Sequence, residues 1–406
     1  MNYVMKKQVL VGMVCLLMSY LVSSQTKFQK DFDFMLSTLK NQYAYFDSKL
    51  TNLEKIKELY QPRVDNITKD SEFIRLVEDV MYEFYDMHMS INKNLSSSFR
   101  LIPSHTDAWI ELIDGKYVVV DVRPTYEAEN KGLKVGATLL SVNGTPINQL
   151  VNNRLPKSIK NSDEKVKVFL ANQIFAGRHD EKREITIAYN GTQKVLSLDK
   201  PTIGKSYKSL LESKKLEGNV GYIKINNSLG NNDLINDFNK AVKSMRSTKA
   251  LILDIRETPD GGNTTVARAI MGKFIIEDML YQKHEYPAEE RYFGVKRSWV
   301  EFVSPYGEVY NKPVIVLVGH WTGSVGEALA LGFDRIPKAK VVGTKMAGLL
   351  GAITCYRFKE TGVNLCFPFE KLYHINGTPR EDFIPRNRTM NSRETYKKAL
   401  QLLKDE

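Results

Sequence analysis

The chain has 406 residues, of which 42% are hydrophobic and 26% charged, and its formal net charge is +11. This balance is typical of a globular protein with about two or three domains, and it excludes a collagen, a coiled coil and a wholly disordered chain. Three cysteines and six histidines, all scattered, are too few for a disulfide-built scaffold or a structural zinc site. No run of Lys or Arg exceeds two residues, so the charge indicates a basic surface rather than nucleic-acid binding.

Residues 1–24 have the pattern of a secretory signal peptide. Lys6 and Lys7 precede an apolar run from Val9 to Val22, and small residues lead to an expected cleavage site before Gln25. The run is too short for a comfortable membrane span, and no later run of about 18 apolar residues follows. We therefore expect an exported protein, periplasmic or extracellular, with no stable membrane span after cleavage. An uncleaved N-terminal anchor is the alternative.

Residues 25–100 predict an N-terminal helical domain, because apolar side chains recur at helical spacing in FDFMLSTLKNQYAYF and EFIRLVEDVMYEFYDMH. Residues 101–200 change to alternating β-forming residues. Asp-Gly or Asn-Gly pairs, which are typical hairpin turns, begin at Asp114, Asn143 and Asn190. The second segment is therefore predicted to form a small β-rich domain.

Residues 205–406 alternate strand-like and helix-like segments and predict an α/β layer domain. KALILDI and KPVIVLVG are almost wholly apolar, as expected for central strands of a parallel sheet. ITCYRFKETGVNLCFPF predicts an antiparallel hairpin that sets Cys355 nearly opposite Cys366. Export permits a disulfide between them but cross-strand geometry often disfavours one, so a disulfide and two packed thiols both stay open. The predicted fold class is α/β within an α+β multidomain chain.

The segment VIVLVGHWTGSVGEAL contains a candidate nucleophile. A buried strand ends at Gly319, a tight glycine turn follows, and a helix is expected to begin near Ser324. This order places the serine hydroxyl at the carboxyl edge of a parallel sheet, beside the unpaired N–H groups of a helix start that suit an oxyanion. Serine is also a common N-cap residue, so a purely structural role stays open.

The segment LILDIRETPDGGNTTVARAI leads from a second central strand into Gly261 and Gly262. Paired glycines after a strand let backbone N–H groups face a ligand, although they are equally typical of an ordinary turn. Asp254 and Arg256 precede them. We interpret these two residues as an ion pair that fixes the strand end, with direct substrate contact as the alternative.

Together, LILDIRETPDGGNTTVA, KPVIVLVGHWTGSVGEALALGF, KVVGTKMAGLLG and NGTPREDFIP resemble the C-terminal processing peptidase and tricorn-core family of serine peptidases, in the family's order. The preceding run YVVVDVRPTYEAENKGLKVGATLLSVNGTPI resembles a PDZ domain of bacterial proteases. The resemblance implies a ClpP/crotonase-like layered sheet in a peptidase core over 205–406, and a PDZ-like domain over 101–200 that adds extended or C-terminal peptide segments at a strand edge. It implies polypeptide substrates and neither a metal nor a cofactor. An oligomer and a β spacer without a ligand stay open.

The resemblance also implies roles for single residues. Ser324 is the nucleophile, and the N–H of Val325 with a glycine of the pair described above forms the oxyanion hole. The processing-peptidase branch of the family uses a lysine as base, but Leu349 stands at the matching position. The tricorn-like branch uses a histidine from an earlier segment, and EFYDMHMSI resembles that element. His88 is therefore the expected base.

A further group is expected to fix the tautomer of the catalytic histidine. The acidic or hydroxyl candidates are Glu381, Asp86, Ser90 and Glu327. The resemblance favours Glu381, because tricorn-like enzymes use a glutamate near the C-terminal end for orientation. His320, four residues before the serine, and Lys345, in the turn after it, are the alternative bases.

We thus expect an exported serine endopeptidase that forms an acyl-enzyme on Ser324, with His88 as general base. Two other functions stay open. One is a catalytically inactive relative that binds peptides or apolar ligands in the same cleft, which Leu349 favours, and the other is an acyl-transfer hydrolase such as an esterase. Residues 280–311 are rich in aromatic and charged side chains, which fits a substrate-side flap and an ordinary surface excursion equally well.

Overall fold

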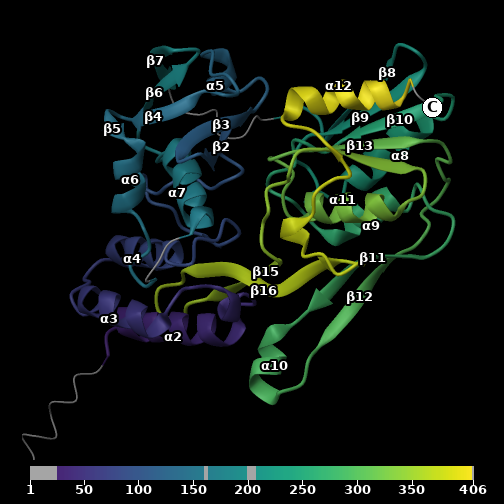
Figure 1. Ribbon diagram of the computed structural model, residues 1–406. Coiled ribbons are helices and arrows are strands. Elements are labelled where there is room, and N and C mark those ends of the chain that lie inside the picture. The colour runs from purple at the N-terminus through teal and green to yellow at the C-terminus, as the bar shows by residue number, and fades with distance from the viewer. Residues whose placement is uncertain (1–24, 160–162, 199–206, 405–406) are drawn as a thin grey trace, which may run out of the picture.

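The computed structural model describes residues 25–159, 163–198 and 207–404 (Figure 1). The expected signal segment, residues 1–24, lies outside this range. Within the range, no helix combines the length and the apolar character that a membrane crossing requires.

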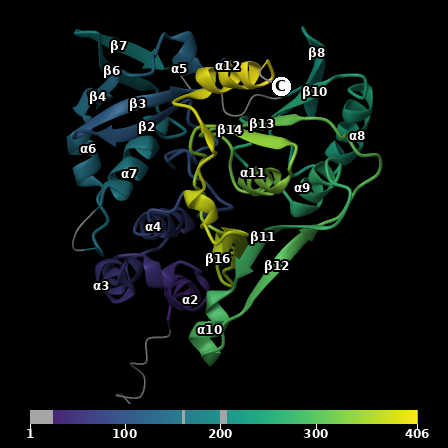
Figure 2. The ribbon, with the colours of Figure 1, turned by 45° about the vertical axis from the view of Figure 1, so that its right-hand side comes forward.

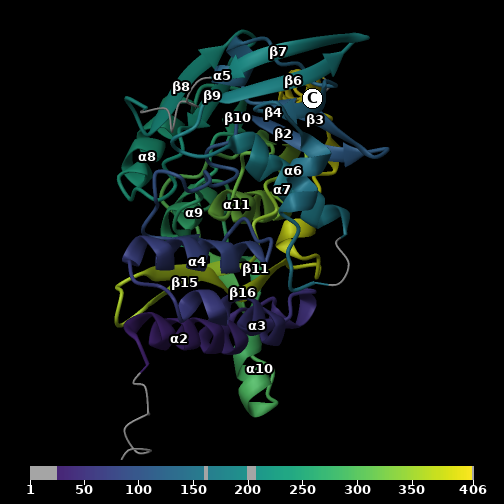
Figure 3. The same cartoon turned by 90° about the vertical axis from the view of Figure 1, so that its left-hand side faces the viewer.

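Three amphipathic helices open the described chain. They are α2 (Lys27–Gln42), α3 (Leu53–Val64) and α4 (Asp70–Tyr82), with a 3-10 turn η2 (Phe46–Ser48) after the first. Their apolar faces share one buried core with a hairpin from the other end of the chain, formed by β15 (Ala352–Arg357) and β16 (Asn364–His374). The short strand β1 (Ser90–Ile91) extends this sheet next to β16. The helices therefore cover the C-terminal hairpin, which lies between α4 and α2 in Figure 3.

The hairpin carries the cysteine pair whose state the sequence leaves open. Cys355 on β15 lies opposite Cys366 on β16, and the two form a disulfide. The bond ties together the strands that the N-terminal helices cover.

Residues 101–198 form a separate β-rich layer with its own core, here called the β-domain. Its sheet has the order β2-β3-β4-β6-β7, with β5 beside β4. The strands are β2 (Ala108–Ile113), β3 (Lys116–Val122), β4 (Thr138–Val142), β5 (Thr145–Pro146), β6 (Arg183–Tyr189) and β7 (Thr192–Leu198), and the helices are α5 (Glu127–Asn130), α6 (Ile147–Asn153) and α7 (Glu164–Ala176). The predicted turns form, because Asp114, Asn143 and Asn190 have φ of 48°, 48° and 50° and each precedes a glycine of positive φ.

The C-terminal part of the chain builds a six-stranded sheet of order β17-β14-β13-β10-β9-β8, in which β8 alone runs antiparallel to its neighbour. Its strands are β8 (Leu211–Leu216), β9 (Val220–Ile225), β10 (Ala250–Asp254), β13 (Val314–Val318), β14 (Ala339–Gly343) and β17 (Asn387–Arg388). Its helices are α8 (Leu234–Ser244), α9 (Thr264–Met271), α11 (Val325–Arg335) and α12 (Ser392–Leu402).

Both faces of this sheet are buried, which explains the apolar strands. Leu251 and Leu253 of β10 point into the core that contains α8, α9 and α11. Ala250 and Ile252, which alternate with them, pack in a second core with α12 on the opposite face. The layers therefore position the carboxyl ends of β10 and β13 side by side.

Between β10 and β13 in the sequence, the chain extends into a long arm that projects from the core. It consists of β11 (Met279–Glu285), α10 (Pro287–Phe293) and β12 (Ser298–Val303), and β11 pairs with β16 in the sheet under the helices. Arg291 of α10 donates hydrogen bonds to the carbonyl oxygens of Asn41 and Tyr43. The aromatic-rich region 280–311 thus reaches to the end of α2, and its tip, α10, extends beyond the other labelled elements (Figure 2).

Candidate active site

The candidate site lies at the carboxyl edge of the parallel strands. Because β10 and β13 are neighbours, the loops that follow them leave the sheet at the same edge. Thr258 and Thr322 of these loops form an isolated parallel bridge, and the N–H of Gly323 donates to Thr258 O at 3.2 Å. The predicted glycine turn and the predicted nucleophile turn are therefore joined through their backbones.

Ser324 occupies the N-cap position of α11, with φ of 50° and ψ of −111°. A positive φ is costly for a residue with a side chain, and such strain recurs at functional turns. Gly261 lies directly against it: a Cβ placed on Gly261 would be 2.5 Å from Ser324 Cβ and 3.1 Å from its Oγ. Only a glycine at position 261 leaves the serine hydroxyl in place.

The predicted oxyanion donors belong to the two turns that meet at Ser324. Val325 is the first residue of α11, so its N–H has no intrahelical acceptor. The N–H of Gly261 donates to Thr258 O at 3.1 Å and is already used in the turn. Gly262, whose Cα packs against the Leu229 carbonyl, is the glycine whose N–H makes no hydrogen bond to any described residue. Among the described residues, the N–H groups of Val325 and Gly262 therefore stay available to a ligand.

His88 follows α4 and reaches the loop after the nucleophile helix. Its ring Nδ1 lies 2.6 Å from the carbonyl oxygen of Leu350, and its backbone N–H donates to Asp86 Oδ1 at 2.8 Å. A carbonyl can only accept, so Nδ1 carries the proton and Nε2 keeps its lone pair. Burial, followed by the nearby Arg380, lowers the pKa of His88 to about 4. The ring is therefore neutral near pH 7, as a general base must be.

The groups predicted to orient this histidine have other partners. Asp86 accepts the backbone N–H of His88 and, at 2.8 Å, the hydroxyl of Tyr43, so it fixes the loop rather than the ring. Ser90 lies in β1, opposite Cys366. The ring partner is a main-chain carbonyl, which has no signature in the amino-acid pattern.

Glu327, the fourth candidate, is fully buried in the first turn of α11. Its Oε2 accepts the N–H of Ser324 at 2.8 Å and of Leu349 at 3.2 Å, and its Oε1 accepts the N–H of Gly348 at 2.9 Å. Burial raises the pKa of this carboxyl to about 7, against the opposing effect of Arg380. The residue braces the start of α11 and also holds the loop around residue 349.

Glu381 lies in the 3-10 turn η3 (Arg380–Asp382) beneath that loop. Its pKa is raised by burial, and the Tyr45 hydroxyl faces it. Neither Tyr45 Oη nor Glu381 Oε2 completes a hydrogen bond with the described residues. The adjacent Arg380 donates from Nη2 to the carbonyl oxygens of Leu349 and Gly351, at 2.9 and 2.7 Å.

A cavity of about 310 Å³ separates the β-domain from this loop. One wall consists of residues from β2 and α7, and the other includes Asp86, residues 345–348, Leu350 and Glu381. β2 is an edge strand of its sheet, but part of its edge is already occupied. Asn172 of α7 accepts the N–H of Ile110 at 2.9 Å and donates to its carbonyl at 2.8 Å, as a neighbouring strand would.

The alternative bases lie in different surroundings. The ring of His320 stacks on Trp109, with centroids 5.1 Å apart, and its Nδ1 is 3.2 Å from Asp121 Oδ2. Both partners belong to the β-domain, so His320 joins the two domains. Lys345 is exposed at the rim of the cavity.

Leu349 stands where the processing-peptidase branch has its lysine, and the structure places it beside the nucleophile turn. Its Cδ1 would be 3.1 Å from a Cβ added to Gly323. An apolar side chain therefore fills this position.

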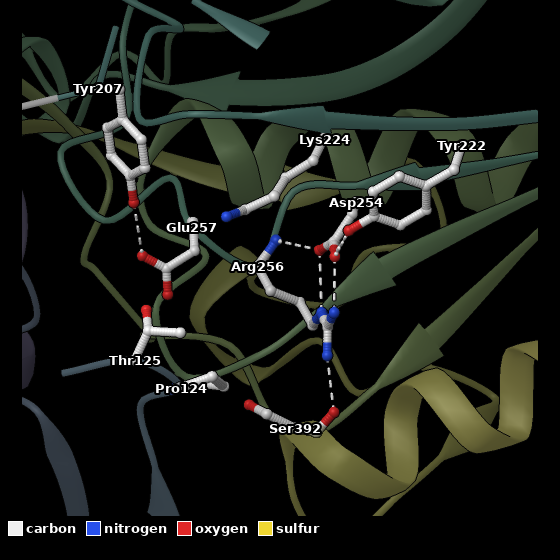
Figure 4. Close-up of a pocket in the computed structure, with 9 residues that line it drawn as sticks. All are labelled: Pro124, Thr125, Tyr207, Tyr222, Lys224, Asp254, Arg256, Glu257 and Ser392. Atoms are coloured by element: carbon white, nitrogen blue, oxygen red, sulfur yellow. Dashed lines mark hydrogen bonds and ion pairs between the residues drawn. The ribbon is translucent and has the colours of Figure 1, made fainter. Parts of the chain in front are cut away.

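Asp254 and Arg256 form the expected ion pair. Arg256 Nη2 lies 2.6 Å from Asp254 Oδ2, and its Nη1 donates to Ser392 O at 2.6 Å (Figure 4). Tyr222 donates to the same carboxylate at 2.7 Å. These groups line a second cavity of about 130 Å³ where the β-domain meets the sheet, and they fix the strand end that precedes the glycines.

Comparisons with known proteins place the chain among peptidases. The model of peptidase family S41 matches residues 219–384, and that of the tricorn protease C1 domain matches residues 24–81. The carboxy-terminal processing protease CtpB of Bacillus subtilis (strain 168) is 25% identical over 316 residues, which are 74% of this chain. The chain spans 59% of the length of that relative.

Solved structures share the fold. The photosystem II D1 C-terminal processing protease superposes with a TM-score of 0.56 at 14% identity, over 90% of this chain and 93% of that one. Mature CPAF, in complex with lactacystin, gives 0.59 at 15% identity, over 93% and 96%. The family matches, the CtpB relative and the shared fold agree: residues 219–384 match peptidase family S41, and the chain is similar to C-terminal processing peptidases, which are serine peptidases.

Proposed function

We propose that this protein is an exported serine endopeptidase with Ser324 as nucleophile and His88 as general base. The observation that carries the proposal is the serine itself. It is held at positive φ at the start of a buried helix, against a glycine that leaves its hydroxyl free of steric contact. The neutral His88 ring, with Nδ1 committed to Leu350 O, supports a base that accepts protons at Nε2.

The reaction follows from these groups. Ser324 Oγ attacks the scissile carbonyl carbon while its proton passes to His88 Nε2, and the N–H groups of Val325 and Gly262 stabilise the oxyanion. The C–N bond then breaks, and the leaving amine takes the proton from Nε2. Water attacks the acyl-enzyme and gives a proton to Nε2, which returns it to Ser324 Oγ as the acid product leaves.

Glu381 is proposed to support the base indirectly, because it lines the cavity together with Leu350, whose carbonyl oxygen holds the His88 ring. Glu381→Gln is expected to lower turnover without abolishing peptide binding, and unchanged kinetics would remove this role.

The β-domain is proposed to act as a PDZ-like module that gathers extended or C-terminal peptide segments beside β2. The cavity between β2, α7 and residues 345–350 offers space for such a segment beside Leu350, whose carbonyl oxygen holds the His88 ring. A peptide that pairs with Ile110 has to displace the Asn172 side chain, because that side chain already takes both backbone groups. Without a peptide, the side-chain amide of Asn172 thus covers part of the β2 edge.

Export is proposed from residues 1–24. N-terminal sequencing of the protein recovered outside the cytoplasm should begin at Gln25. An unprocessed N-terminus on an intracellular protein would contradict export.

The test of the activity is cleavage of an unfolded protein by the chain from Gln25 onward, beside Ser324→Ala and His88→Ala. Loss of cleavage in both folded variants supports the proposal. Loss in the serine variant alone moves the base to His320 or Lys345.

The second candidate function is an inactive peptide-binding relative, which the apolar Leu349 beside the nucleophile turn favours. That candidate predicts no cleavage by the unmodified chain.

A further inference from the structure

We propose that Glu327 is a positioning residue: it holds the Ser324 turn in register with the loop that orients His88, and so places nucleophile and base relative to each other. The inference rests on the proposed peptidase function and adds a group to it that touches neither substrate nor the reacting atoms.

The carboxylate of Glu327 accepts hydrogen bonds from two segments of the chain. Glu327 accepts the N–H of Ser324 on its own helix and the N–H groups of Gly348 and Leu349 on the following loop, all within 2.8 to 3.2 Å. Three backbone donors from two separate segments therefore meet at a single side chain. Above its pKa of about 7, where the carboxyl is ionised, each of these hydrogen bonds is roughly twice as strong as a neutral one.

The same loop also holds the proposed base, His88. Leu350, the next residue after this pair, supplies the carbonyl that holds His88 Nδ1 at 2.6 Å. Arg380 binds the carbonyl oxygens of Leu349 and Gly351 from the other side. The loop is fixed through its N–H groups by an anion and through its carbonyls by a cation, and the carbonyl for His88 lies between these contacts.

Ordinary helix capping does not account for the burial of Glu327. Glu72 has the same place in α4, where it accepts the N–H of Lys69 at 3.1 Å and of Thr68 at 3.0 Å, and it is exposed. Capping alone therefore needs no burial. Glu327 is fully buried, which is costly for a carboxylate unless hydrogen bonds compensate. The two additional bonds to the loop provide that compensation, and they are the ones that connect the nucleophile to the base.

The experiment compares wild type, Glu327→Gln, Glu327→Ala, Arg380→Lys and the matched capping control Glu72→Gln. Active sites are counted with a fluorophosphonate, and kcat and KM for a fluorogenic peptide are expressed per titrated site. Displacing reacting groups by about 1 Å costs on the order of 100-fold in rate. We expect a kcat loss of that order for Glu327→Ala, a smaller loss for the isosteric Glu327→Gln, and a KM within about twofold of wild type. Glu72→Gln should match wild type.

The pH profile gives a second readout, which a merely structural role would not move. Glu327→Gln should lose any acid limb that depends on this carboxyl. Unchanged kcat per titrated site and an unchanged profile in Glu327→Gln overturn the inference, even if the yield of folded protein falls. If Glu327→Ala does not fold, the Gln and Arg380→Lys variants decide. No turnover by wild type overturns the proposed function instead, and the inference with it.

Discussion

The carbonyl oxygen of Leu350 lies 2.6 Å from Nδ1 of His88, a residue 262 positions earlier in the chain. In a Ser-His-Asp triad a carboxylate holds this nitrogen and stabilises the imidazolium that forms. Here a neutral backbone group fixes the tautomer, and the ring is buried next to Arg380, which disfavours its charged form. The proposed base is thus oriented by the loop after the nucleophile helix rather than by an acid of its own.

We expect His88→Ala to lower kcat by about 10²- to 10⁴-fold, the usual contribution of a positioned general base. The fold should survive, because the ring contacts only backbone groups of residues 350 and 351 through hydrogen bonds, and Asp86 retains its bond to the backbone of residue 88. Peptide hydrolysis and far-UV circular dichroism check both points. Full activity of a folded His88→Ala variant would show that another residue is the general base.

The pH dependence should reflect Glu327 more than His88. His88, with a pKa lowered to about 4, is already neutral over most of the range. Glu327 has a pKa of about 7, raised by burial and by Glu381 and opposed by Arg380, so its three hydrogen bonds to N–H groups are complete only above that pH. We expect kcat/KM to rise with pH through about 7 in wild type, and the limb to move toward about 4 in Glu327→Gln. A limb that stays in place would show that another group titrates.

The same carboxyl predicts an opposite trend in stability. Its pKa in the folded state lies above the value of about 4.3 expected for an unfolded chain, so the fold favours the protonated form. The stability that it contributes is present below the unfolded pKa and is lost as pH rises to about 7. Urea unfolding of wild type and Glu327→Gln at pH 5 and 8 should show a smaller pH effect in the variant. Equal pH effects would contradict this assignment.

Gly261→Ala separates steric contact from backbone strain. Its Cβ would lie 2.5 Å from Ser324 Cβ, at φ of 66°. Gly115 has a similar φ of 73° with nothing within 4 Å, so Gly115→Ala is the matched control. Both variants should lose about 1 kcal/mol of unfolding free energy for the left-handed conformation. Peptidase activity should be lost only in Gly261→Ala. Equal activities of the two variants would show that Gly261 does not contribute to the active site.

Asn172→Ala tests the proposed peptide edge. The change leaves the N–H and carbonyl of Ile110 unpaired, which should cost about 1 to 3 kcal/mol of stability. An extended peptide would no longer have to displace the amide, so its affinity by fluorescence anisotropy should increase. Asn152→Ala, on the exposed side of α6, is the control. Unchanged or weaker binding in Asn172→Ala would place the peptide elsewhere.

The local features of the fold could be predicted because their causes are local. Asn190-Gly191 sets a type I′ turn by its own backbone preferences, and the apolar KALILDI and KPVIVLVG indicate strands buried on both faces. Two parallel neighbours then bring Gly261 and Ser324 to one edge, as the structure has them.

The remaining features depend on contacts between distant segments. The bond from His88 to Leu350 uses a main-chain acceptor, which is the same for every residue type. Glu327 could be assigned to the helix start from sequence, but its bonds to the loop 21 and 22 residues later could not. The state of Cys355 and Cys366 required the relative geometry of two strands, and only the structure provides it.

The most direct test of the central claim is the intact mass of the chain from Gln25 onward after treatment with a fluorophosphonate, followed by peptide mapping. The account predicts one adduct per molecule, located on Ser324, with none in Ser324→Ala and much slower labelling in a folded His88→Ala. An unlabelled wild type, or equal labelling of wild type and Ser324→Ala, would contradict it.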